Sequence, residues 1–471
     1  MILTGHTPVE VKGSLEGIPD ELKNSAAKIL AFSGIPEERA ALLQANLRLF
    51  QNLKDKNMMD NEARRIREIV AKVFFEVYEA VLKRVIREKS RDRLPQMLLR
   101  FAYLDENLLT PEQVMALYQM TESPAGNVGL SIYDTGAWME QVYSMEKDPS
   151  LNEYGLDYFD VFRDKKKRGE LTEQDRVGYE RDCDGRLQHE LLNLFRLGQR
   201  ICCGHVGSYF PTLHKGMIQG YLEKSLVTPE RVKESLNRVL EVDFSAFHRE
   251  LVYSQPGGIQ KELIMKPVMP DFILVPTFGS RAVMWQGLTG KVRNSPGRIL
   301  FPQFTSENLD NLMIDAVAKF RWDLSKSMYS YTNNDGPGSL VSDYIDYLQF
   351  YRKNRDLSDE AREKVKKQVD KYRNNTGEIF AADYHTWITY ESKGLVRLNK
   401  VARKILFKHC PFSKTVREGL VNQPLYSEMI TRFNTQQNKK AKLLEARYMK
   451  QVKPGTPADP ELMDNLIYHM M

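Results

Sequence analysis

The stretch Asn61–Asp92, NEARRIREIVAKVFFEVYEAVLKRVIREKSRD, carries the strongest structural signal in the chain. Its apolar residues recur at spacings of three and four, and arginine and lysine residues lie on the other faces. That period gathers the apolar side chains on one stripe of an α-helix. The stretch therefore predicts a helix of about eight turns with one broad buried face. The same face could also receive a partner subunit.

Helical pattern extends over most of the chain on both sides of this stretch. Thr110-Pro111-Glu112 and Thr228-Pro229-Glu230 each place a capping threonine before a proline and an acidic residue, which is the chemistry of a helix start. No internal repeat of fixed period is present, so a solenoid is not predicted. We expect a mainly α, multi-helix fold without repeats.

One block, residues 255–304, differs in kind because proline and glycine interrupt it repeatedly. Between them lie three short apolar runs, Phe272–Val275, Ala282–Trp285 and Ile299–Phe301. Runs of this length between turn residues favour short buried strands or an ordered loop over helices. The block is therefore predicted as a small irregular or strand-containing insertion in a helical protein.

The length of 471 residues predicts more than one domain. Composition and turn signals suggest five segments along the chain. These are an N-terminal helical domain (1–122), a mixed helical region with irregular loops (123–254), the Pro/Gly-rich block (255–304), a C-terminal helical basic module (305–453) and a tail (454–471).

Positive charge is concentrated near the C-terminus. From Glu391 to Lys453 there are fifteen Lys/Arg and four Asp/Glu, a net charge of +11, whereas the whole chain carries +6. The remainder is thus slightly acidic, at −5. A mildly acidic body with a basic end predicts an anionic partner at that end.

A helix expected over residues 395–408 presents the most regular set of cations. Its apolar residues form one stripe and its basic residues line other faces at spacings of three and four. We take these basic residues as the candidate partner-binding set: Arg397, Lys400, Arg403, Lys404 and Lys408. Tyr384, Trp387 and Tyr390 nearby could stack on nucleic-acid bases. The alternative is an ordinary solvated helix face with the aromatics in the core.

The Pro/Gly-rich block offers a second candidate site. It sets cations on a glycine-rich backbone beside an aromatic wall, a combination found in ligand pockets. The candidate ligand-binding residues are Arg281, Trp285, Arg293 and Arg298. They would suit a small anionic ligand, whereas the alternative is a purely structural connection between two helical halves.

Cysteine and histidine gather within thirty-two residues, at Cys183, His189, Cys202, Cys203, His205 and His214. Thiolate and imidazole are ligands of zinc and iron. However, the adjacent Cys202 and Cys203 lack the usual two-residue gap, and His189-Glu190 does not continue as HExxH. We therefore predict no metal site; the alternative is a metal ion held by this cluster.

Motifs for catalysis are absent from the sequence. Gly287–Val292 is not a P-loop, and neither GxGxxG nor GxSxG occurs. We predict no catalytic residues and no cofactor. The N-terminus does not resemble a signal peptide and no apolar run is long enough to cross a bilayer, which favours a cytoplasmic protein.

The expectation from sequence is a non-enzymatic helical interaction or scaffold protein that docks an anionic partner through its basic C-terminal module. The partner could be an acidic protein or nucleic acid; a membrane is not expected, and a homo-oligomer is possible. The alternative is a ligand-binding protein or enzyme with an anion pocket in the 255–304 block.

Overall fold

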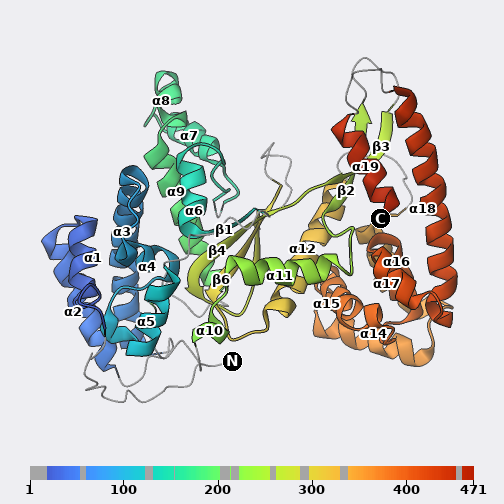
Figure 1. Cartoon of the computed structure of the whole chain (residues 1–471), viewed down its shortest axis with the longest axis horizontal. Helices are drawn as coiled ribbons and strands as arrows, with labels where there is room; N and C mark the ends of the chain where they lie inside the picture. The colour runs from blue at the N-terminus through green and yellow to red at the C-terminus, as the bar shows by residue number, and fades with distance from the viewer. Residues whose placement is uncertain are drawn as a thin grey trace. The chain divides into compact units, whose positions relative to one another are not determined.

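The computed structural model describes residues 18–53, 60–121, 131–152, 154–201, 213, 222–254, 261–286, 296–328, 338–451 and 459–471. The protein is mainly α-helical, as predicted (Figure 1). It divides into two compact units. Unit 1 comprises residues 1–233, 271–286 and 298–309, and unit 2 comprises residues 234–270, 287–297 and 310–471. Each unit is thus assembled from segments that are separate in sequence.

The first part of unit 1 is built around the long helix that the sequence predicts. Its helices are α1 (Ser25–Ser33), α2 (Glu37–Asn52), α3 (Asn61–Glu88), α4 (Arg93–Phe101) and α5 (Pro111–Met120). Helix α3 begins where Asp60 accepts a hydrogen bond from the backbone of Ala63, and it ends at Lys89, which has a left-handed conformation. Most of its apolar stripe is buried, including Val73, Phe74 and Val77. Helices α1, α2 and α4 cover it, so the stripe is not a free subunit interface.

The second part of unit 1 is a four-stranded sheet. Its strands are β1 (Ile132–Asp134), β4 (Asp271–Phe278), β5 (Val283–Gln286) and β6 (Arg298–Phe304), in the order β1-β4-β6-β5. Strands β1, β4 and β6 are parallel, and β5 pairs antiparallel with β6. The three apolar runs of the Pro/Gly-rich block therefore form β4, β5 and β6, as predicted. Strand β1 was not predicted, because it has only three residues.

Helices that follow β1 in the sequence complete unit 1. They are α6 (Thr135–Tyr143), α7 (Tyr158–Lys167), α8 (Arg176–Glu180), α9 (Cys183–Ile201) and α10 (Leu222–Ser225). Helices α6 and α9 contact each other and β4, so the sheet is buried on the side that they occupy (Figure 1). All seven residues of β6 are buried, as expected for a central parallel strand.

Unit 2 combines a two-stranded sheet with a set of helices. Strands β2 (His248–Ser254) and β3 (Lys261–Pro267) pair antiparallel. The helices are α11 (Pro229–Leu240), α12 (Leu309–Met328), α13 (Leu340–Phe350), α14 (Asp359–Lys371), α15 (Thr376–Thr389), α16 (Lys400–His409), α17 (Lys414–Leu420), α18 (Pro424–Gln451) and α19 (Pro460–Met470). The boundary between the units falls within α11 and at the start of α12. Strand β2 lies in a region expected to be helical and irregular, and it corrects that expectation.

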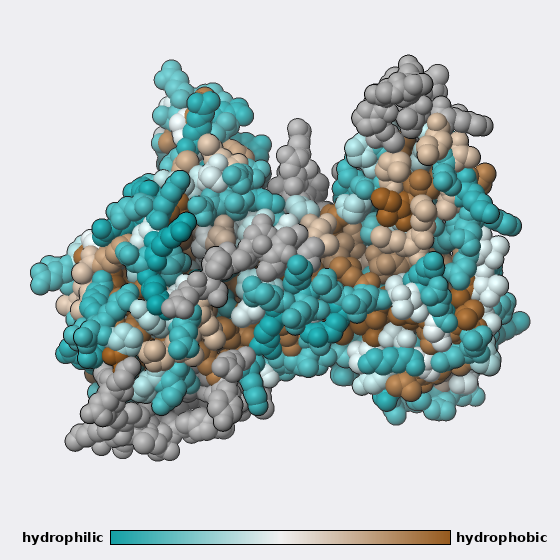
Figure 2. Space-filling view, viewed as in Figure 1, coloured by the Kyte–Doolittle hydropathy of each residue, from teal (hydrophilic) through white to brown (hydrophobic). Residues whose placement is uncertain are grey.

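Within the segment expected as a tail, Pro460–Met470 form helix α19. Asp459 accepts a hydrogen bond from the Glu461 backbone and Pro460 occupies the first turn, so the helix has a regular start. Leu462 and Leu466 pack with Ile264 of β3 and with two residues of α18, Leu444 and Tyr448. The outer face of α19 leaves Met463, Ile467 and Met470 partly exposed, and apolar side chains are visible over this helix in Figure 2.

No helix within the described ranges combines the length and apolar character needed to cross a membrane.

Candidate functional site

Three of the predicted partner-binding lysines lie on exposed faces of α16, and each is paired with a carboxylate. Lys400 and Lys404 lie 3.0 and 3.2 Å from the two oxygens of Asp356. Lys408 lies 2.8 Å from Asp343, which also contacts His409. The lysine side chains remain about half exposed. Exposed ion pairs of this kind contribute little free energy, so these lysines can exchange Asp343 or Asp356 for another anion.

Arg403 is the exception among the predicted residues, because it is buried. Its Nε donates to Oε2 of Glu391 at 2.7 Å, and Glu391 is fully buried. Glu391 also accepts hydrogen bonds from the backbone of Arg397 and Leu398 at 2.6 and 2.7 Å, and from the Tyr426 hydroxyl. Burial opposes ionisation, but these donors, Arg403 foremost, hold the pKa of Glu391 below its ordinary value. Arg403 therefore stabilises unit 2 and does not belong to an exposed surface.

The predicted aromatic contacts are also occupied. Tyr384 and Trp387 are completely buried. The Tyr384 hydroxyl donates to Asp243 at 2.8 Å, and the Trp387 indole donates to the Cys410 carbonyl at 3.0 Å. The guanidinium of the exposed Arg397 lies 4.1 Å from the centre of the Tyr390 ring. These rings are core or covered groups, so stacking of bases on them is not available in this structure.

More cations surround Asp356 than the sequence analysis anticipated. Lys353 and Arg355 are exposed in the same short segment as Asp356, which holds Lys400 and Lys404. We call Lys353, Arg355, Lys400 and Lys404 the α16 cluster. One carboxylate among four cations leaves a local net charge of +3.

Helix α18 carries a second basic surface, which is not among the candidate sites named from sequence. The inner face of α18 buries Tyr426, Ile430, Leu444 and Tyr448. Its exposed side carries Arg432, Lys439, Lys440 and Lys442, for which the described residues provide no carboxylate within ion-pair distance. We call these four residues the α18 basic face. Figure 2 shows hydrophilic side chains along this helix among a few apolar ones.

The predicted ligand-binding residues of the Pro/Gly-rich block do not share one exposed pocket. Arg281 is exposed, Trp285 is half-buried against the core of unit 1, and Arg298 is only 2% exposed. Arg293 lies outside the described residues.

Arg298 is enclosed by protein groups. It donates to the Ser150 hydroxyl and to the Asp148 carbonyl, the latter at 2.6 Å. Its Nη1 lies 3.8 Å from Oε1 of the fully buried Glu190, and its guanidinium lies 4.6 Å from the centre of the Trp138 ring. Burial lowers the pKa of Arg298, with Glu190 opposing that effect. This geometry ties the segment around Ser150 to β6 and α9.

Sequence analysis missed Glu190 as a buried ion-pair partner. Glu190 accepts from Trp138 Nε1 at 2.7 Å and from the Ser150 hydroxyl at 2.8 Å. The preceding His189 contacts the Ser150 carbonyl at 3.0 Å. The sequence analysis considered His189-Glu190 only as the start of a zinc-binding motif. The available signal was that Glu190 lies beside apolar residues of a predicted helix, a position where a carboxylate needs a buried partner.

Little of the cysteine and histidine cluster falls in the described chain. Cys183 has a free thiol and His189 belongs to the Glu190 network. Cys202, Cys203, His205 and His214 lie outside the described residues. Among the residues that are described, no three His, Cys, Asp or Glu side chains are placed to hold a metal ion.

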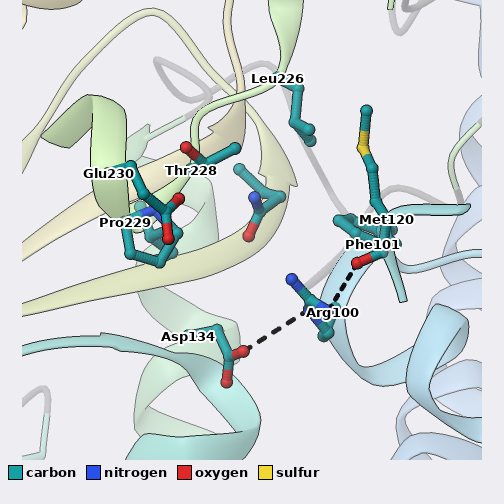
Figure 3. Close-up of a pocket in the computed structure, with 10 residues that line it drawn as sticks. Arg100, Phe101, Met120, Asp134, Leu226, Thr228, Pro229 and Glu230 are labelled. Carbon is teal, nitrogen blue, oxygen red and sulfur yellow. Dashed lines mark hydrogen bonds and ion pairs between the residues drawn. The ribbon is translucent and has the colours of Figure 1, made fainter. Parts of the chain in front are cut away.

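Unit 1 contains a small pocket that sequence analysis did not anticipate (Figure 3). Its cavity volume is about 150 Å³, and its lining comes from six separate stretches of the unit. The lining residues are Arg100, Phe101, Met120, Asp134, Leu226, Thr228, Pro229, Glu230, Leu274 and Gln303. Asp134 ends β1, and Thr228, Pro229 and Glu230 form the start of α11.

Arg100 and Asp134 face each other in this pocket. Arg100 Nε lies 3.7 Å from Asp134 Oδ2, and Arg100 Nη1 donates to the Met120 carbonyl at 3.1 Å (Figure 3). Asp134 Oδ1 caps α6 by accepting from the Ala137 backbone at 2.8 Å. Burial raises the pKa of Asp134, partly offset by the backbone hydrogen bond and by Arg100.

One segment of the chain matches a known protein family. Residues 329–468, which fall within unit 2, match a family described as Domain of unknown function (DUF8509). No curated protein and no solved structure matches the chain.

Proposed function

We propose that the protein is a non-enzymatic helical interaction protein that docks an anionic partner through unit 2. The observation that carries the proposal is the α18 basic face: four exposed cations on one helix with no carboxylate partner among the described residues. The α16 cluster supplies further positive charge, reduced by Asp356.

The spacing of the α18 basic face suits an extended polyanion. Arg432 and Lys439 are seven residues apart, about 10 Å along the helix axis, and Lys442 follows one turn later. Binding of charges arranged along a helix releases counterions from a polyanion and therefore weakens as salt increases.

Contact with the partner is proposed to be electrostatic and independent of base identity. Tyr384 and Trp387 are buried and Tyr390 lies against Arg397, so none of these three aromatic residues offers a free face for stacking. Without base contacts, phosphate or carboxylate charge supplies the attraction.

Salt-dependent binding tests this proposal. A fluorescein-labelled 20-nucleotide poly-uridine RNA and a labelled polyglutamate peptide of equal length would be titrated with the full chain at several salt concentrations. The proposal predicts affinity for at least one polyanion, falling steeply as salt rises. The tighter of the two identifies the class of partner. Binding that persists unchanged in half-molar salt, or no binding of either probe at low salt, would contradict it.

A further inference from the structure

The pocket of unit 1 lies where a parallel sheet offers a binding position. Asp134 is the last residue of β1, and Leu274 of β4 is its register partner. Gln303 is the next-to-last residue of β6. Open sheets of parallel strands bind ligands beyond the carboxyl ends of their strands, where the loops leave a crevice.

Asp134 brings an unsatisfied oxygen to this position. The residue is 5% exposed, and its Oδ2 has no hydrogen-bond partner among the described residues. Arg100 Nε is 3.7 Å away, which is an ion-pair contact but too long for a hydrogen bond. A buried carboxylate oxygen without a donor is costly, so a donor group in the pocket would be favoured.

The charge of the lining selects the kind of donor. Asp134 and Glu230 carry two negative charges and Arg100 carries one positive charge, so the ionisable lining sums to −1. Arg100 is already directed to Asp134 and to the Met120 carbonyl. An added cation would therefore balance the pocket, whereas an added anion would face two carboxylates.

The remaining lining sets the size and character of the ligand. Phe101, Met120, Leu226, Pro229 and Leu274 provide apolar walls. A cavity of about 150 Å³ has the volume that accommodates a benzene-sized molecule.

We propose that this pocket binds a small organic cation, a primary amine or amidine with an apolar body about the size of a benzene ring. Its ammonium or amidinium group donates to Asp134 Oδ2, and Glu230 at the rim adds attraction. The apolar body contacts Phe101, Met120 and Leu274. This site is independent of the polyanion docking proposed for unit 2.

Calorimetric titration of the full chain with matched probes tests the site. Benzylamine and benzamidine supply the cation, and benzyl alcohol and benzoate supply the same ring without it. We expect both cations to bind with a Kd on the order of 1 mM or tighter and the neutral and anionic probes to bind about tenfold more weakly or not at all.

Two variants assign the carboxylates. Asp134→Asn keeps an acceptor for the α6 cap but removes the charge, and should weaken benzylamine binding by about tenfold. Glu230→Gln, at an exposed position, should weaken it severalfold without affecting folding. Glu112→Gln is the matched control, because Thr110-Pro111-Glu112 starts α5 with the same residues as Thr228-Pro229-Glu230 but lies outside the pocket. Circular dichroism would verify that each variant is folded.

Four results would overturn the assignment. One is equal binding of benzylamine and benzyl alcohol. Another is unchanged benzylamine affinity in both folded carboxylate variants. The third is no binding of either cation at concentrations on the order of 10 mM. Selective binding of benzoate would show an anion site at the start of α11 and would also reject the cation site.

Discussion

Glu391 and Arg403 form a buried ion pair, with 2.7 Å between Oε2 and Nε, at the junction of three segments of unit 2. Glu391 precedes the loop to α16, Arg403 lies within α16, and Tyr426 of α18 donates to the same carboxylate. Arg403 lies in the most basic region of the sequence, but it does not belong to an exposed surface. It instead helps to hold together the segments that carry the basic surfaces.

Glu391→Gln should strongly destabilise unit 2. The change leaves the Arg403 guanidinium buried without its counter-charge, and the loss of one partner of a buried pair costs about 3–5 kcal/mol. The free energy of unfolding would be measured by urea titration. Glu360→Gln is the control, since Glu360 pairs with Lys364 on an exposed helix face, where loss of the pair should change stability little. Similar losses in both variants would contradict the structural role of Glu391.

Ionisation of the buried Asp383 should lower the stability of unit 2 as the pH rises from about 4 to about 6. Burial raises the pKa of Asp383 to about 6, although hydrogen bonds from Gln368 and Tyr344 lower it in part. The folded state then retains a proton that the unfolded state has already lost, so stability falls over this interval, by about 3 kcal/mol in total.

The comparison with Asp383→Asn isolates this effect. The stability advantage of the variant should grow between pH 4 and pH 6 and then level off, as measured by urea unfolding at each pH. The difference between the two proteins is needed because burial also lowers the pKa of His469, to about 4. That histidine removes stability as the pH falls, the opposite direction. A constant difference between wild type and variant at all pH values would show that Asp383 ionises normally.

Arg298 should matter for stability and Arg281 should not. Arg298→Met leaves Glu190 as an unpaired buried carboxylate, at a cost of about 3–5 kcal/mol, whereas Arg281→Met changes an exposed residue. Adding Glu190→Gln to Arg298→Met should recover part of the loss, because the two residues are energetically coupled. Additive losses in urea unfolding of the double variant would argue against the pair.

The helices that could be predicted from sequence are those with long periodic patterns or clear caps. Helix α3 was predicted within four residues of its observed end, because its stripe repeats over the whole length. The capping box of Thr110 with Gln113 confirmed the predicted start of α5. The apolar runs within the Pro/Gly-rich block gave three of the strands.

The elements that were missed depend on contacts far along the chain. Strand β1 is too short for a pattern and forms by pairing with β4, 140 residues away in register. Asp459-Pro460-Glu461 is a recognisable helix start for α19. However, the two buried leucines of α19 stabilise the helix only by packing against β3 and α18. Short segments carry too little local preference to specify structure without such packing.

The net charge of a region can be counted from sequence, but the ion pairs that its lysines form with distant carboxylates cannot be predicted. The net charge of the C-terminal region was available directly. The carboxylates that balance it, Asp343 and Asp356, precede their lysine partners by more than forty residues. The pocket around Asp134 was missed for the same reason, since its lining comes from residues 100 to 303.

The most direct measurement of the central claim compares two triple variants that remove equal charge. Lys439→Gln, Lys440→Gln and Lys442→Gln together remove three cations of the α18 basic face. Lys165→Gln, Lys166→Gln and Lys167→Gln remove three consecutive cations of α7 in unit 1. Affinity for the 20-nucleotide RNA or the polyglutamate peptide would be measured across a salt series. The account predicts that the α18 variant alone loses affinity, with a slope of log K against log salt smaller by about two on the RNA. Equal losses in both variants, or none in the α18 variant, would contradict it.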